Sequence, residues 1–202
     1  HGTLYVNRNV DEDDSVESYT GKIFESAMAS LDQVHHSLDM SAVNRAVDLL
    51  TQAKKIAFFG LGSSAAVAHD AMNKFFRFNV PVIYSDDIVL QRMSCMNCDD
   101  DDVVVIISHT GRTKSLVELA QLARENDAMV IALTSAGTPL AREATLAITL
   151  DVPEDTDIYM PMVSRLAQLT VIDVLATGFT LRRGAKFRDN LKRVKEALKE
   201  SR

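Results

Sequence analysis

Five short apolar segments, separated by stretches with helical periodicity, constrain the fold of this chain more than any other feature of its sequence. They occupy residues 54–60, 80–85, 103–108, 128–134 and 144–150. Each segment is apolar nearly throughout instead of alternating with polar residues, so each is expected to be buried on both faces. Such strands, joined by helices, are typical of an α/β fold with a parallel sheet that helices cover on both sides.

The order of these strands follows from the handedness of their connections. With right-handed crossovers, a five-stranded parallel sheet is expected to adopt the flavodoxin-like order 2-1-3-4-5, flanked by helices. In that order strands 1 and 3 are neighbours, and the helices that follow them leave on opposite faces of the sheet. The crevice beyond the carboxyl ends of these two strands is where open α/β sheets bind ligands.

Helical periodicity continues beyond the sheet at both ends of the chain. Residues 15–38 predict an N-terminal helix, and residues 162–182 and 185–202 predict two C-terminal helices. Their apolar stripes are wider than one small sheet face requires. These extra helices therefore predict a surface on which subunits pair, in a homodimer or a tetramer.

The first 14 residues differ in composition from the rest. They have no apolar periodicity and include an acidic run at residues 11–14, which is typical of a linker. We expect residues 1–14 to be the remnant of a linker and residues 15–202 to form one domain. Something is expected to precede this linker in the natural protein.

Composition limits the functions open to the chain. It has 202 residues, enough to bury about 70% of the unfolded surface, and a net charge of −6 that argues against nucleic-acid binding by this segment itself. No apolar run approaches the roughly 20 residues of a membrane span, and no signal peptide is visible. The two cysteines, Cys95 and Cys98, suit a reducing compartment. We expect a cytoplasmic protein without a membrane partner.

Two loops rich in glycine and hydroxyl groups border the predicted crevice. Strand 1 runs into GLGSS at residues 60–64, and strand 3 runs into SHTGRT at residues 108–113. Glycine allows close backbone approach, and the first turn of a helix offers unpaired N–H groups to an anion. Ser63 or Ser64 can alternatively act as an ordinary helix cap. Two such loops on neighbouring strands favour a binding site for a small phosphorylated molecule.

The same loops do not match the common nucleotide-binding motifs. There is no GxxxxGK[ST] sequence, and GLGSSA lacks the third glycine of GxGxxG. We therefore expect no nucleotide cofactor and, more generally, no cofactor.

At these residues the chain resembles the sugar isomerase (SIS) domain, a phosphosugar-binding module of this topology. SHTGRT is similar to the S-x-S/T-G-x-T loop of that family, GLGSS is similar to its first hydroxyl loop, and the resemblance covers about residues 40–183. The resemblance implies that hydroxyl groups and the backbone around one glycine hold the sugar phosphate. The residues concerned are Ser63, Ser64, Ser108, Thr110, Gly111 and Thr113.

Further stretches resemble RpiR-type bacterial transcriptional regulators of hexose catabolism. They are YVNRNVDEDDS, HDAMNKFFRFNVP, QRMSCMNC and SRLAQLTVIDVLATGFTLRRG. Such regulators have an N-terminal helix-turn-helix DNA-binding domain, a linker and an SIS domain. The resemblance implies that a DNA-binding domain is missing here and that this domain, not the 202 residues of the chain, contacts DNA. It also implies the effector 2-keto-3-deoxy-6-phosphogluconate, which neither spacing nor composition identifies.

SIS folds also occur in phosphosugar isomerases, so an enzyme is the alternative to a sensor. Isomerisation needs an acid–base group, and Glu154, after strand 5, lies where such enzymes place a carboxylate. Glu154 and His109, which lies in the loop after strand 3, are candidate ligand contacts. Glu154 can equally be a solvated loop residue, and His109 can point away from the site. Arg165 is a candidate anion partner, or a surface residue. We expect a sensor without catalytic residues, because the first residues resemble the linker of a regulator.

Other polar clusters predict no site. The sequence CMNC supplies two thiols where a metal needs more ligands, and the aspartates at 99–102 lack calcium-loop spacing. We expect structural thiols, a solvated acidic turn and no metal. The basic residues of the last helix are expected to form a solvated face, with DNA contact as the less favoured alternative.

Overall fold

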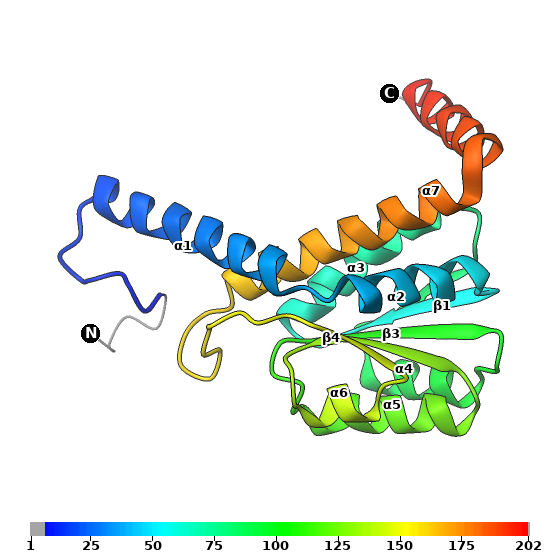
Figure 1. Cartoon of the computed structure of the whole chain (residues 1–202), viewed down its shortest axis with the longest axis horizontal. Coiled ribbons are helices and arrows are strands. Elements are labelled where there is room, and N and C mark those ends of the chain that lie inside the picture. Colours follow the sequence, from blue (N-terminus) through cyan, green and yellow to red (C-terminus); the bar gives the residue numbers. More distant parts are fainter. Residues whose placement is uncertain (1–6, 202) are drawn as a thin grey trace.

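The computed structural model describes residues 7–201 and contains one five-stranded sheet (Figure 1). All four neighbouring pairs are parallel, in the order β2-β1-β3-β4-β5. The predicted fold class and strand order are therefore confirmed. The strands are β1 (Lys55–Phe59), β2 (Val82–Tyr84), β3 (Asp102–Ser108), β4 (Met129–Thr134) and β5 (Leu146–Thr149).

Helices cover both faces of this sheet, as its apolar strands require. Alternate residues of β3 divide between the two cores: Val105 and Ile107 face one layer, and Val104 and Ile106 face the other. The first layer contains α2 (Met40–Gln52), α3 (Ser63–Phe76) and α7 (Val163–Lys199). The second contains α4 (Ile88–Met96), α5 (Lys114–Glu125) and α6 (Pro139–Glu143). The helices after β1 and β3 thus lie on opposite faces, as predicted.

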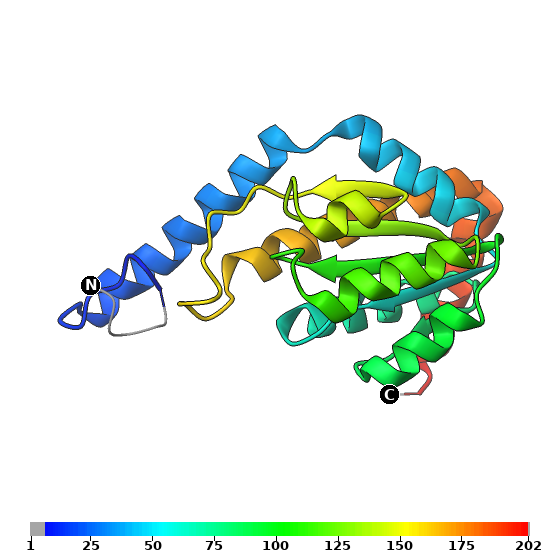
Figure 2. The ribbon, with the colours of Figure 1, turned by 90° about the horizontal axis from the view of Figure 1, so that it is seen from below.

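The N-terminal helix α1 (Val16–Ser37) is confirmed, but much of it lies away from the sheet (Figures 1 and 2). Ser15 caps it by accepting a hydrogen bond from the Ser18 N–H at 3.1 Å. Ser30 and Val34, in its second half, are buried. Apolar residues of the first half, including Val16 and Phe24, are exposed.

The two predicted C-terminal helices form one element, α7, with a break at Gly184. This glycine has φ 83° and ψ −172°, a conformation that side chains with a Cβ rarely adopt. Beyond the break, Phe187 packs on the rings of Phe78 and Phe179, with centroids 5.8 and 5.9 Å away. The rest of the segment projects from the body (Figure 1).

The predicted linker lies partly outside the described residues, which begin at Asn7. Residues 7–14 form turns, and Lys22 of α1 holds the carboxylates of Asp14 and Asp11 at 2.7 and 3.4 Å. Within residues 7–201, none of the helices combines the length and apolar character needed to cross a bilayer.

Candidate functional site

The loops at residues 60–64 and 108–113 leave the same edge of the sheet. They follow β1 and β3, which are hydrogen-bonded neighbours with Phe59 in register with Ile106. Parallel strands end at a common edge, so the sheet brings the two loops to the predicted crevice.

The loop after β3 is shaped by contacts of its own residues. The buried Ser108 side chain accepts a hydrogen bond from the Gly111 N–H at 3.0 Å. Gly111 has φ 61°, and a Cβ there would lie 2.2 Å from Thr138 Oγ1 and 2.6 Å from Thr134 Oγ1. Only glycine fits this turn without a shift of its neighbours. Ser108 and Gly111 therefore set the shape of the loop.

A cavity of about 470 Å³ opens beside this loop. Its lining residues come from the ends of β3 and β4 and from the segment after β5: Thr110, Arg112, Thr113, Ser135, Ala136, Thr138 and Asp157. Thr113 occupies the N-cap position of α5, but its side chain makes no capping hydrogen bond. Its hydroxyl is free to donate to a ligand, beside the unpaired N–H groups of the first turn. This arrangement suits an anion.

The loop after β1 differs from the sequence expectation. The N-cap of α3 is Gly62, with φ 59° and no side-chain hydrogen bond, so neither Ser63 nor Ser64 caps the helix. Both serines lie within the first helical turn, with Ser64 buried and Ser63 partly exposed. Glycine readily adopts the positive φ seen at Gly62. The helix therefore begins at Ser63, one residue earlier than it would if Ser63 were the cap. Neither serine lines the 470 Å³ cavity.

His109 joins the loop to neighbouring segments instead of pointing away. Its Nε2 lies 2.6 Å from the Glu154 carbonyl oxygen. A carbonyl only accepts, so Nε2 carries the proton in this contact. The hydroxyl of Ser135 donates to the His109 carbonyl at 2.5 Å. His109 thereby connects the ends of β3 and β4 to the segment after β5.

The Glu154 carboxylate caps the N-terminus of α7. It accepts hydrogen bonds from the N–H groups of Met162, Val163 and Ser164 at 3.0, 2.9 and 3.2 Å, and from the Ser164 hydroxyl at 2.5 Å. This role was not predicted from the sequence. The one available signal is that Pro161 and Met162, just before α7, offer no capping side chain, so the cap must come from elsewhere in the chain.

Arg165, the anion partner suggested by the sequence, lies outside the 470 Å³ cavity. Arg165 is exposed on the first turn of α7 and has no ion-pair partner among residues 7–201. Lys74 of α3 lies 2.6 Å from Asp70 and 3.0 Å from Asp173, so it links α3 to α7.

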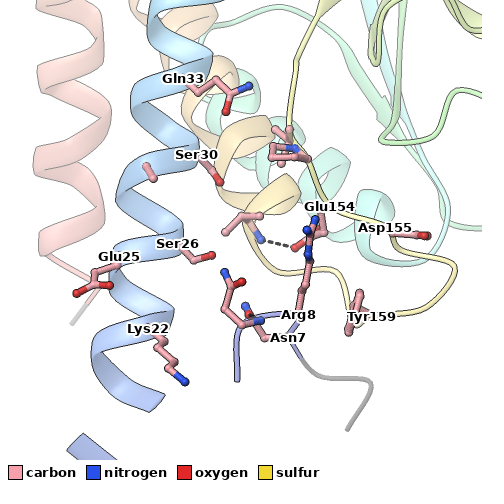
Figure 3. A pocket seen from close by; sticks show the side chains of 15 residues that line it. Asn7, Arg8, Lys22, Glu25, Ser26, Ser30, Gln33, Glu154, Asp155 and Tyr159 are labelled. Atoms are coloured by element: carbon pink, nitrogen blue, oxygen red, sulfur yellow. Dashed lines mark hydrogen bonds between the residues drawn. The ribbon is translucent and has the colours of Figure 1, made fainter. Parts of the chain in front are cut away.

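A second, larger cavity was not foreseen from the sequence. It measures about 780 Å³ and lies between α1 and the segment 152–163 (Figure 3). Arg8, Ser26, Ser30, Glu154 and Tyr159 are among its lining residues. Glu154 therefore borders this cavity while its backbone contacts the loop after β3.

Two further polar clusters lie outside both cavities. Cys95 and Cys98 are free and buried, and burial raises the pKa of the Cys95 thiol to about 12. The carboxylates of Asp99, Asp100 and Asp101 are exposed in the turn before β3.

Comparison with known proteins identifies the family. A family model described as "SIS domain" matches residues 49–178. The HTH-type transcriptional regulator HexR of Escherichia coli strain K12 is 94% identical over 202 residues, which are all of this chain and 70% of that protein. The chain belongs to the HexR family of HTH-type transcriptional regulators. The HexR of Pseudomonas aeruginosa PAO1 is 57% identical over 197 residues, 98% of this chain and 69% of that protein.

Membership in the HexR family confirms the resemblance to RpiR-type regulators and to the SIS domain. Both HexR relatives are named as transcriptional regulators and not as enzymes. The fold is shared with the Vibrio vulnificus NanR protein, solved in complex with ManNAc-6P, at a TM-score of 0.83. That comparison has 23% identity and covers 93% of this chain and 71% of NanR.

Proposed function

We propose that this domain senses a phosphorylated sugar acid and thereby controls a DNA-binding domain that precedes it. The observation that carries the proposal is the 470 Å³ cavity at the N-terminus of α5, where the Thr113 hydroxyl makes no capping bond. A phosphate there would accept hydrogen bonds from Thr110, Thr113 and first-turn N–H groups. The exposed Arg112 adds positive charge to the same lining.

The proposed effector is 2-keto-3-deoxy-6-phosphogluconate, as the family resemblance implies. Binding of a phosphorylated sugar by NanR, which shares this fold, supports the class of ligand. The effector has a phosphate at one end and a carboxylate at the other. The phosphate is assigned to the loop at residues 108–113.

The other candidate residues take different proposed roles. Ser63, Ser64 and Arg165 are proposed ligand contacts from the first turns of α3 and α7. His109 and Glu154 are proposed to position the site, because their hydrogen bonds join the loop after β3 to α7. Both Glu154 oxygens accept hydrogen bonds from the start of α7, which supports a positioning role for this carboxylate.

The sensing domain is proposed to act as a homodimer in the cytoplasm. Large apolar side chains are exposed on α1 and on the outward face of α7, which includes Leu166, Val174 and Leu181. Burial of such surface favours association. DNA contact is assigned to a separate helix-turn-helix domain, as the resemblance to RpiR-type regulators implies.

The test is a calorimetric and thermal-shift comparison of ligands with this chain. We expect 2-keto-3-deoxy-6-phosphogluconate to bind and gluconate, which lacks a phosphate, to fail. At 100 times its Kd the ligand should stabilise the fold by about 2.7 kcal/mol. For a domain of this size that corresponds to a rise in Tm of roughly 5–11 °C.

Hydroxyl-deleting variants locate the site. Thr110→Val and Thr113→Val each remove one hydrogen bond to a charged phosphate, so each should weaken binding about tenfold or more. Thr177→Val removes a hydroxyl from the exposed side of α7 and should leave the affinity unchanged. Unchanged affinity in both loop variants would place the ligand elsewhere, and turnover of aldose or ketose phosphates would contradict a pure sensor.

A further inference from the structure

Two helical segments at opposite ends of the molecule expose apolar residues that find no partner in their own chain. One is the first part of α1, where Phe24 and Met28 are 65% and 61% exposed. The other is the segment 185–199 beyond Gly184, where Leu198 is 50% exposed. Figures 1 and 2 both place the two segments at opposite ends of the long axis, so they cannot meet within one chain.

The segment 185–199 is an amphipathic helix. Its apolar residues recur at helical spacing and form a single stripe: Phe187, Leu191, Val194 and Leu198. Phe187 packs against the aromatic core, whereas the rest of the stripe continues past the body of the domain. An amphipathic stripe that leaves the core needs another apolar surface to bury it.

The two segments carry opposite charges. Residues 185–199 contain six basic and two acidic residues. Residues 11–37 contain seven acidic residues and one lysine. Glu17, Glu25 and Asp32 lie on α1 beside the Phe24 and Met28 side of the helix, as helical spacing places them. Each segment thus offers an apolar stripe flanked mainly by charges opposite in sign to those that predominate on the other segment.

A two-fold axis brings the segments together. They lie at opposite ends of the helix layer formed by α1 and α7, and the C-terminal segment projects outward from that layer (Figure 1). Rotation by 180° about an axis through the middle of that layer exchanges its ends. The outward face of α7 lies between the segments and exposes apolar side chains among polar ones, with Leu181 64% exposed. A second copy would therefore cover a continuous surface, in a self-complementary contact.

We propose that, in the homodimer, the C-terminal segment 185–199 of each copy packs on α1 of the other copy. This rests on the proposed homodimer and adds the pairing that holds it. Association of the two segments buries both apolar stripes and sets basic residues against acidic ones. Because α1 directly follows the proposed linker, the partner's C-terminal segment would fix the direction in which that linker leaves the domain.

Charge reversal tests the pairing. The variant Glu17→Lys, Glu25→Lys, Asp32→Lys places like charges opposite each other in a homodimer, as does Lys192→Glu, Lys195→Glu, Lys199→Glu. We expect each variant to raise the dimer dissociation constant at least tenfold at low salt, measured by sedimentation velocity. An equimolar mixture of the two should form heterodimers, detected by native mass spectrometry, because both contacts in the heterodimer are complementary again.

A matched control changes the same number of charges on the other helix layer. Glu118→Lys, Glu125→Lys, Glu143→Lys lies on α5 and α6 and should leave dimerisation unchanged. Truncation after Arg183 removes the C-terminal segment and should weaken the dimer at least tenfold. Its thermal unfolding would show that the remaining domain is folded.

Three outcomes would overturn the proposal. A wild-type dimer that withstands both charge reversals is held by another surface. If the Lys→Glu variant still dimerises but loses a salt-sensitive binding to duplex DNA that the wild-type chain shows, the segment is a DNA contact and not a dimer contact. A wild-type chain that is monomeric at all concentrations would refute the homodimer itself, which separates that failure from failure of the pairing alone.

Discussion

Replacement of Glu154 by alanine tests the link between the loop after β5 and the longest helix. The change removes a carboxylate that accepts bonds from three N–H groups and one hydroxyl at the start of α7. Loss of an N-terminal cap costs about 0.5–2 kcal/mol. Loss of a negative charge at a helix N-terminus costs about 0.3–1 kcal/mol more.

Val163 and Ser164 are buried, so the expected loss of unfolding free energy lies toward the upper end of these two ranges. An unsatisfied buried donor costs about 1–3 kcal/mol, although water in the adjacent cavity can replace part of the lost bonding. We therefore expect Glu154→Ala to reduce the free energy of unfolding by about 2–3 kcal/mol. For a chain of this length the Tm should fall by roughly 4–12 °C.

Urea unfolding followed by circular dichroism measures this cost. Asp155→Ala is the matched control, because among residues 7–201 the exposed Asp155 carboxylate accepts a hydrogen bond only from the Asp157 N–H within its own loop. It should change stability by less than about 0.5 kcal/mol. Glu154→Gln should fall between the two, since an amide keeps one acceptor oxygen but turns donors toward the helix N–H groups. Equal stability of Glu154→Ala and Asp155→Ala would refute the capping role.

Two further predictions concern the turn after β3 and the buried thiols. Gly111→Ala should lower the free energy of unfolding, measured in urea, by about 2–4 kcal/mol, because the new Cβ would collide with Thr138 at a positive φ. Gly137→Ala is the control: it has φ 70° but open space around it, so it should lower the free energy of unfolding by only about 1 kcal/mol. Equal losses in the two variants would contradict the close packing at Gly111. Cys95 and Cys98 should not react with Ellman's reagent at pH 8 until the chain is unfolded, because burial raises the pKa of both thiols; fast reaction of the folded chain would show that they are accessible.

The sheet could be predicted because its signal is local and repeated. The run VVVIIS in β3 is buried along its whole length, and its neighbours in sequence supply the alternating helices. Parallel strands and right-handed crossovers leave few possible orders, so the position of the crevice followed as well. The loop at residues 108–113 was identified for the same reason, since it directly follows the best-defined strand.

Contacts between distant segments could not be predicted. The capping of α7 by Glu154 spans a loop of irregular conformation, and nothing in the local sequence indicates which carboxylate reaches the helix. Gly62 occupies the N-cap position of α3 at φ 59°, and the sequence alone does not report this backbone angle. The exposure of Phe24 depends on how far α1 extends beyond the body of the domain, which helical periodicity does not report.

Glu154 contacts both a short turn, which carries His109, and the long helix α7. Its carbonyl oxygen receives the ring of His109, and its carboxylate holds the first turn of α7. From Val163 to the break at Gly184 that helix runs for about 30 Å, as a stiff rod. A small movement of the turn that carries His109 would thus reach the first turn of α7. Because α7 is long, a small tilt there would become a larger displacement at the break at Gly184.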